Sequence, residues 1–173
     1  TELLMKCPNM ASLERALEER HSVGDDSHQR YTTRLVLRNL MRDNAVMKEV
    51  VAREWSDRDA TYLVDVMIGV PSQEAAIFLA GHINHTDWRG DDLSRLYEHL
   101  VRYSPPSDLE RVIQNSRSRS SNDLDFQYVV FKGIQQGIAR RGEKETKPVQ
   151  AWGATLAREL LDKYPLTTKK TLR

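Results

Sequence analysis

Two histidines and three aspartates lie within twelve residues, in the stretch GHINHTDWRGDD. Imidazole and carboxylate groups are common ligands of zinc. His82 and His85 would share one face of a continuous helix, and Asp87 could complete a ligand shell. A catalytic zinc helix, however, sets its histidines four apart around a glutamate, and here the spacing is three. Histidines in a last helical turn also interact favourably with the helix dipole, so we predict a bend between two helices, with no metal and no cofactor.

Paired carboxylates, which acid–base catalysis would need, occur at three places. Each pair lies at the predicted start of a helix, where the exposed amides and the dipole favour negative charge. The chain has no Gly-x-Ser-x-Gly elbow and no phosphate-binding glycine loop, and Cys7 is its only cysteine. We therefore predict structural roles for the six aspartates and no enzyme activity for the chain. They are Asp57, Asp59, Asp91, Asp92, Asp123 and Asp125.

Basic residues gather in the polar run SRSRSSND, which contributes Arg117 and Arg119 and is predicted to be a linker. Such a loop could contact phosphates. The whole chain, however, carries 26 Lys and Arg against 25 Asp and Glu, and no aromatic residues interleave with the run. We therefore predict no nucleic-acid partner. Trp88, Arg117 and Arg119 are instead the candidates for contact with a protein partner, Trp88 because a tryptophan in a polar corner is a typical interface anchor.

Helices must position these residues, because almost every segment repeats its apolar residues with a period near 3.6. Of the 173 residues 39% are hydrophobic and 29% charged, with only 8 Gly and 6 Pro, which is typical of a folded helical domain. The β-rich stretch YVVF lies inside a longer helical pattern. We expect about nine helices. Predicted N-caps are Asn44, Ser56, Ser72 and Ser107, and predicted ends are Pro71, the Pro105-Pro106 pair and Gly142.

An internal repeat appears when the sequence is shifted by 35 residues. YLVDVMIGVPSQEAAIF then aligns with YEHLVRYSPPSDLERVI, and each copy reads as a helix, a Pro-Ser corner and a second helix. A third pair, residues 122–164, follows the same plan. Helix pairs that repeat every 30 to 50 residues are the signature of an α-solenoid. The predicted fold is thus all-α, a HEAT/armadillo-like α-solenoid of stacked helix pairs, and the alternative is an irregular helical bundle.

The expected domain organisation is one helical-repeat domain over residues 1–173. Residues 1–43 form atypical N-terminal helices, 44–164 the helix-pair repeats and 165–173 a tail. The ragged ends TELLMKC and TTKKTLR suggest a fragment of a larger protein. No run of residues is apolar enough to predict insertion into a membrane.

The segments VMIGVPSQEAAIFLAGHI, LYEHLVRYSPPSDLERVI, FKGIQQGIARRG and VQAWGATLARELL resemble the HEAT-like helical region of large secreted bacterial proteins. In planctomycetes, verrucomicrobia and Bacteroidetes, such regions accompany c-type cytochrome, sugar-dehydrogenase-like or glycoside-hydrolase-like domains. The resemblance covers about residues 45–164. It implies a docking or spacing module of an exported carbohydrate-degrading protein, and an extracytoplasmic location follows from it alone. It brings no catalytic residue to these positions.

We therefore expect a non-catalytic module that docks a protein partner or neighbouring domains of the same chain. One alternative is a metal-dependent helical enzyme that uses His82, His85 and Asp87. The second alternative is a helical repeat that binds nucleic acid.

Overall fold

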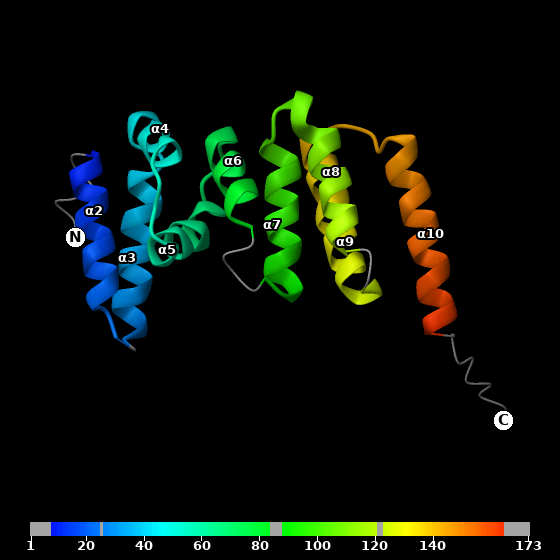
Figure 1. Cartoon of the computed structure of the whole chain (residues 1–173), viewed down its shortest axis with the longest axis horizontal. Coiled ribbons are helices and arrows are strands. Elements are labelled where there is room, and N and C mark those ends of the chain that lie inside the picture. Colours follow the sequence, from blue (N-terminus) through cyan, green and yellow to red (C-terminus); the bar gives the residue numbers. More distant parts are fainter. Residues whose placement is uncertain (1–7, 25, 84–87, 121–122, 165–173) are drawn as a thin grey trace. The chain divides into compact units, whose positions relative to one another are not determined.

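The computed structural model describes residues 8–24, 26–83, 88–120 and 123–164. Over these ranges the protein is all-α, with nine helices and no strand (Figure 1). This confirms the predicted fold class at the level of secondary structure. The YVVF stretch is helical, as expected. The helices are α2 (Met10–Ser22), α3 (Ser27–Leu40), α4 (Asn44–Ala52), α5 (Asp57–Met67), α6 (Gln73–His82), α7 (Gly90–Tyr103), α8 (Pro106–Ser120), α9 (Leu124–Arg141) and α10 (Lys147–Lys163).

The chain divides into two compact units. One comprises Thr1–Trp88 and Tyr103–Leu109, and the other comprises Arg89–Arg102 and Glu110–Arg173. The expectation of one repeat domain over the whole chain stays a prediction.

Helices of the first unit are held together by aliphatic side chains. Helix α2 packs on α3, α3 on α5, and α6 on both α4 and α5. The buried residues recur three or four positions apart along each helix, so every helix turns one apolar stripe inward. Leu13, Leu37, Leu40, Leu63, Met67 and Leu79 are among the fully buried side chains.

The second unit brings α9 against α7 at two glycines. A Cβ atom on Gly133 would lie 2.3 Å from the backbone oxygen of Ser94, and one on Gly137 would lie 2.6 Å from Cβ of Val101. Only glycine therefore permits this close approach. Helix α10 packs on α9 through Trp152. The ring of Trp152 lies edge-on to the ring of Phe131, with the two ring centroids 5.0 Å apart. Trp152 is a core residue, as predicted.

Short polar side chains begin most of the helices. Ser56 and Ser72 accept hydrogen bonds from backbone amides three residues ahead, as predicted for N-caps. Two cap predictions are wrong. Asp43, not Asn44, caps α4 by accepting from the amides of residues 45 and 46. Helix α8 begins at Pro106, so Ser107 lies inside its first turn, where proline is also well suited.

Helix ends follow the sequence closely where a breaker is present. Helix α7 stops at Tyr103, before the proline pair. Gly142 ends α9 in the left-handed conformation, with φ +74°, as expected of a C-terminal glycine. The polar run SRSRSSND does not act as a breaker: α8 continues to Ser120, through most of the predicted linker. The hydroxyls of Ser116, Ser118 and Ser120 donate to carbonyls four residues earlier in α8, so these polar side chains are satisfied within the helix.

The 35-residue repeat corresponds to the pairs α5–α6 and α7–α8. Val66 and Val101, which align, are both buried. The corners are not equivalent, because Pro71 lies two residues before α6 whereas Pro106 is the first residue of α8. Residues 124–163 form the third predicted pair, α9 and α10, which pack on each other.

Candidate functional site

His82 lies in the last turn of α6, as predicted, and turns back onto its own helix. Its Nδ1 lies 2.9 Å from the carbonyl oxygen of Phe78, and the two rings stack at 4.0 Å. Because a carbonyl only accepts, Nδ1 carries the proton and donates. His85 and Asp87 lie outside the described residues. Within the described part of the chain, no group of three or more histidine, cysteine, aspartate and glutamate side chains could hold a metal ion.

Trp88, Arg117 and Arg119 were the residues predicted to contact a partner. Trp88 is half-buried, and its Nε1 is shielded from solvent without a hydrogen-bond partner among the described residues. Both arginines lie on α8, which corrects the expectation that they belong to a loop. The guanidinium of Arg117 lies 5.9 Å from the centroid of the Trp152 ring. Partner contact by these three residues stays a prediction.

Arg119 lies near the largest fully buried side chain, Tyr97 of α7. Burial raises the pKa of Tyr97, because the charged phenolate is disfavoured away from water. The Arg119 guanidinium and the Ser116 hydroxyl act in the opposite direction on this pKa. Neither group completes a well-formed hydrogen bond with the Tyr97 hydroxyl. The arginine therefore contributes to a partly polar contact between α7 and α8.

All six paired aspartates lie at helix starts, as predicted. Asp57, Asp59, Asp91, Asp92 and Asp125 are in first turns, and Asp123 is the N-cap of α9. Asp125 has a further role, because Lys163 Nζ lies 2.9 Å away and the Tyr164 hydroxyl lies 3.0 Å from the same oxygen. These hydrogen bonds, the one from Lys163 foremost, lower the pKa of Asp125, and the hydrogen bond that Lys163 donates to Asp125 raises the pKa of Lys163.

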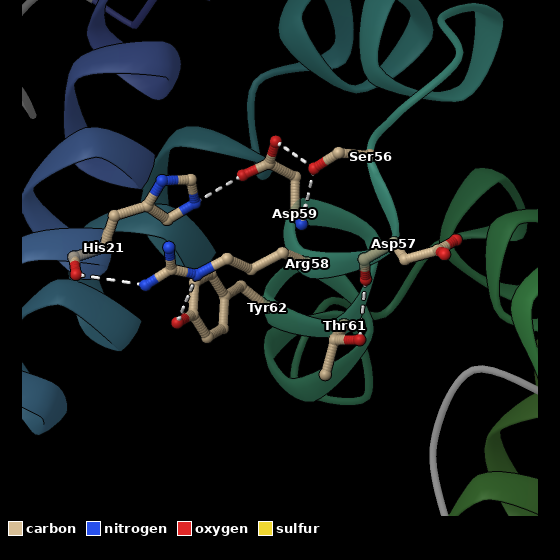
Figure 2. Close-up of polar contacts among 7 residues, drawn as sticks. All are labelled: His21, Ser56, Asp57, Arg58, Asp59, Thr61 and Tyr62. Carbon is tan, nitrogen blue, oxygen red and sulfur yellow. Dashed lines mark hydrogen bonds and ion pairs between the residues drawn. The ribbon is translucent and has the colours of Figure 1, made fainter.

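Asp59 belongs to a cluster that sequence reasoning missed, in which α2 ends beside the start of α5 (Figure 2). His21 Nε2 lies 2.7 Å from Asp59 Oδ1, so this nitrogen carries the proton. Ser56 Oγ donates to the other carboxylate oxygen at 2.7 Å and accepts from the Asp59 amide at 3.2 Å. Residues 21 and 59 are too far apart in the chain for any sequence motif to signal this contact.

This cluster contains the three residue types of a hydrolase triad in the wrong order. In a triad the histidine stands between carboxylate and hydroxyl, so that it can take the proton of the nucleophile. Here Asp59 stands between His21 and Ser56 (Figure 2). The carboxylate therefore accepts from both neighbours, and the histidine is bonded to the carboxylate rather than to the serine hydroxyl. The arrangement caps α5 and ties it to α2.

Arg58 completes the tie in the opposite direction. Its Nη2 donates to the backbone oxygen of His21 at 3.1 Å, and its Nε lies 3.3 Å from the Tyr62 hydroxyl (Figure 2). The C-terminal end of a helix carries partial negative charge, so a guanidinium there is stabilising. Arg58 of α5 thus compensates the end of α2, and His21 of α2 binds the carboxylate in the first turn of α5.

No helix of the described residues is both long and apolar enough to cross a membrane, in agreement with the prediction of no membrane insertion. The comparison with known proteins adds no relative: no family model, no curated protein and no solved structure matches this chain.

Proposed function

We propose that this chain is a non-catalytic, HEAT-like α-solenoid module that docks another protein or a neighbouring domain. The observation that carries the proposal is a set of large side chains left exposed on the pair α9–α10. Tyr128, Leu161 and Tyr164 are 51%, 55% and 53% exposed. Several large side chains exposed near one another are more informative than a single one, and aromatic residues are enriched at protein contact surfaces.

The three side chains belong to one end of the helix pair. Asp125 lies one turn before Tyr128 on α9, and it is bonded to Lys163 and Tyr164 at the end of α10. The start of α9 and the end of α10 are therefore neighbours. The ionic contact holds the two backbones together beside the exposed side chains, so a partner would meet a surface that is already ordered, and ordering would cost little on binding.

The hydrogen bonds of the candidate acid–base residues support the same proposal, because these carboxylates are bonded to neighbouring side chains. Asp59 is bonded to His21 and Ser56, and Asp125 to Lys163 and Tyr164. Following the resemblance of residues 45–164, we further propose that the module belongs to a larger exported, carbohydrate-degrading protein.

Photo-crosslinking tests the docking proposal. Benzoylphenylalanine would replace Tyr128 or Leu161 in the full chain, which is expressed in source cells. The matched control carries benzoylphenylalanine in place of Arg95, which is exposed on α7. We expect one discrete adduct of the same mass from both test positions and none from position 95. Equal adducts at all three positions, or none at the test positions, would overturn the proposal.

Calorimetry separates docking from the rival metal enzyme. Titration of the chain with zinc should give no stoichiometric heat. A tight one-to-one isotherm that His82→Ala abolishes, while the exposed control His28→Ala leaves it intact, would support the enzyme and contradict our proposal.

A further inference from the structure

Four arginines from α2, α3 and α5 lie along one side of α5, and the proposed docking surface on α9–α10 does not use them. Positions 58, 62, 65 and 69 follow one another at helical spacing, so they lie on one side of α5 and of the turn that follows it. Arginines from α2 and α3 reach this same side. We call Arg20, Arg34, Arg38 and Arg58 the arginine row.

At one end of the row, Arg20 and Arg58 contact the aromatic ring of Tyr62. The guanidinium carbon of Arg20 lies 4.4 Å from the centroid of the Tyr62 ring, and that of Arg58 lies 5.8 Å from it. Cation–π contact holds a guanidinium without occupying the hydrogen-bond donors at its edge. Arg20 can therefore still bind an anion while it is stacked.

The other end of the row is built on α3. Arg34 forms an ion pair with Asp65, with Nε 2.9 Å from Oδ2, and both side chains are about half exposed. Arg38 lies over Gly69, where a Cβ would come within 2.8 Å of Arg38 Cδ. A Cβ at this position would force the arginine side chain to shift. The Nε of Arg38 is shielded and has no hydrogen-bond partner among the residues that the structure describes.

The row is electrostatically one-sided. Four guanidinium groups span on the order of 16 Å along the helix, and Asp65 is the carboxylate paired within the row. Asp59, the nearest other acid of α5, is already bonded to His21 and Ser56. Guanidinium groups bind carboxylates and phosphates through two parallel hydrogen bonds. Arg34 already makes two such bonds to Asp65, and Arg58 donates to His21 and Tyr62, so Arg20 and Arg38 are the members of the row best suited to an anionic ligand.

The net charge of the unit disfavours a nucleic acid more than a short acidic peptide. Residues 1–88, which make up most of the unit, carry 10 Lys and Arg against 14 Asp and Glu, a formal charge of −4. A polyphosphate backbone extends beyond the row and would meet this negative field. A segment with two or three carboxylates would meet only the row.

We propose that the arginine row binds a short acidic segment of a partner protein, about five residues long when extended. This inference rests on the proposed docking function and names the chemistry of one partner. The binding should weaken with salt, because the exposed part of the row is screened.

Fluorescence anisotropy with the full chain provides the test. The probe is a labelled ten-residue peptide of alternating Glu and Ser, and its Gln–Ser counterpart is the uncharged control. The double variant Arg34→Gln/Arg38→Gln removes two charges from the row, and Arg15→Gln/Arg158→Gln removes two exposed charges elsewhere. We expect the row variant to weaken binding of the acidic peptide about tenfold, since each lost charged contact contributes about 1 kcal/mol or less. The control variant should change it less than about twofold. Arg34→Gln alone, at an exposed ion pair, serves if the double variant unfolds, with a loss of about threefold expected.

Three outcomes would overturn the inference. They are no binding of the acidic peptide at low salt, equal weakening by the row and control variants, and tighter row-dependent binding of a ten-residue oligothymidylate. Any of these together with intact crosslinks from Tyr128 and Leu161 would remove the arginine row alone and leave the docking proposal standing.

Discussion

At the scale of single residues, Gln127 and Trp152 form a buried hydrogen bond between two side chains. The indole Nε1 donates to Gln127 Oε1 at 2.7 Å, and both side chains are buried. A buried amide without a partner is costly, so the tryptophan supplies both apolar volume and the donor that Gln127 needs.

Trp152→Phe should therefore destabilise the second unit by about 2–4 kcal/mol, from the lost hydrogen bond and the cavity left by the smaller ring. Denaturant unfolding followed by circular dichroism measures this. Thr155→Ser, at an exposed site of the same helix, is the control and should change stability by less than about 0.5 kcal/mol. A Trp152→Phe variant as stable as the parent would contradict the packing described for α9 and α10.

The Asp125 carboxylate gives a prediction for pH dependence. Its pKa is lowered below the ordinary value of 3.8, chiefly by the hydrogen bond from Lys163. Its contribution to stability is therefore present above that value and is lost as the pH falls through the folded-state pKa. Lys163, with a pKa raised above 10.5, contributes below that value and loses its contribution as the pH rises.

The carboxyl carbon chemical shift of Asp125, followed by NMR as a function of pH, should give a titration midpoint below pH 3.8. The substitution Lys163→Met should return this midpoint toward 3.8. Asp162→Asn, which removes a neighbouring exposed charge, should leave it nearly unchanged. An Asp125 midpoint above 3.8 in the parent chain would show that the contact does not form in solution.

Residue roles were predictable from sequence only where they are local. The six aspartates were assigned correctly because a helix start is a property of neighbouring residues. The bond between His21 and Asp59 and the row formed by Arg20, Arg34, Arg38 and Arg58 join different helices, and spacing within one segment carries no information about them. The polar composition around Arg117 and Arg119 predicts a loop, whereas the helical register of α8 continues through both residues.

At the scale of elements, the glycines within helices are of two kinds. Some allow a neighbouring helix to pack closely, and others only lower the stability of the helix that contains them. Gly133 faces the backbone of α7 with no room for a methyl group, whereas Gly81, in α6, has nothing within 4 Å of its would-be Cβ. The same substitution should therefore have opposite effects at the two positions.

Gly133→Ala should destabilise the protein by about 1–3 kcal/mol through overpacking, and Gly81→Ala should stabilise it by about 0.5–1 kcal/mol because alanine is the better helix former. Thermal melting of both variants beside the parent is sufficient. Equal effects of either sign would contradict the close packing of α7 and α9.

The start of α4 allows a second element-scale test. Asp43 accepts hydrogen bonds from the amides of residues 45 and 46, at 2.9 and 3.1 Å, whereas Asn44 is already inside the helix. Asp43→Ala should cost about 1 kcal/mol, and Asn44→Ala should cost nothing or stabilise slightly, because alanine favours a helix interior. The reverse order in chemical unfolding would restore the prediction made from sequence.

Element type was predictable because the apolar period persists through nearly every segment, whereas element boundaries were not. Asp43 and Asn44 are both good caps, and the choice between them depends on where the α3–α4 turn places the chain. Ser107 and Glu110 match a capping box, yet Pro106 is suited to a first helical position and α8 starts there.

At the scale of the whole molecule, helix pairs and exposed contact surfaces together support a docking module. The repeat at a spacing of 35 residues corresponds to two successive helix–turn–helix segments, α5–α6 and α7–α8, whose corners differ by two residues. The docking surface on α9–α10 and the arginine row belong to different units, so each can be disabled by substitution while the other is measured.

The size of the native polypeptide tests the central claim, that this chain is a docking module of a larger exported protein. Immunoblots of source-cell fractions with an antibody against residues 8–164 would give it directly. We predict a band well above 20.0 kDa, in the envelope or secreted fraction. A band at the mass of the chain itself, confined to the cytoplasm, would contradict the claim, and these helices would then have to perform the whole function.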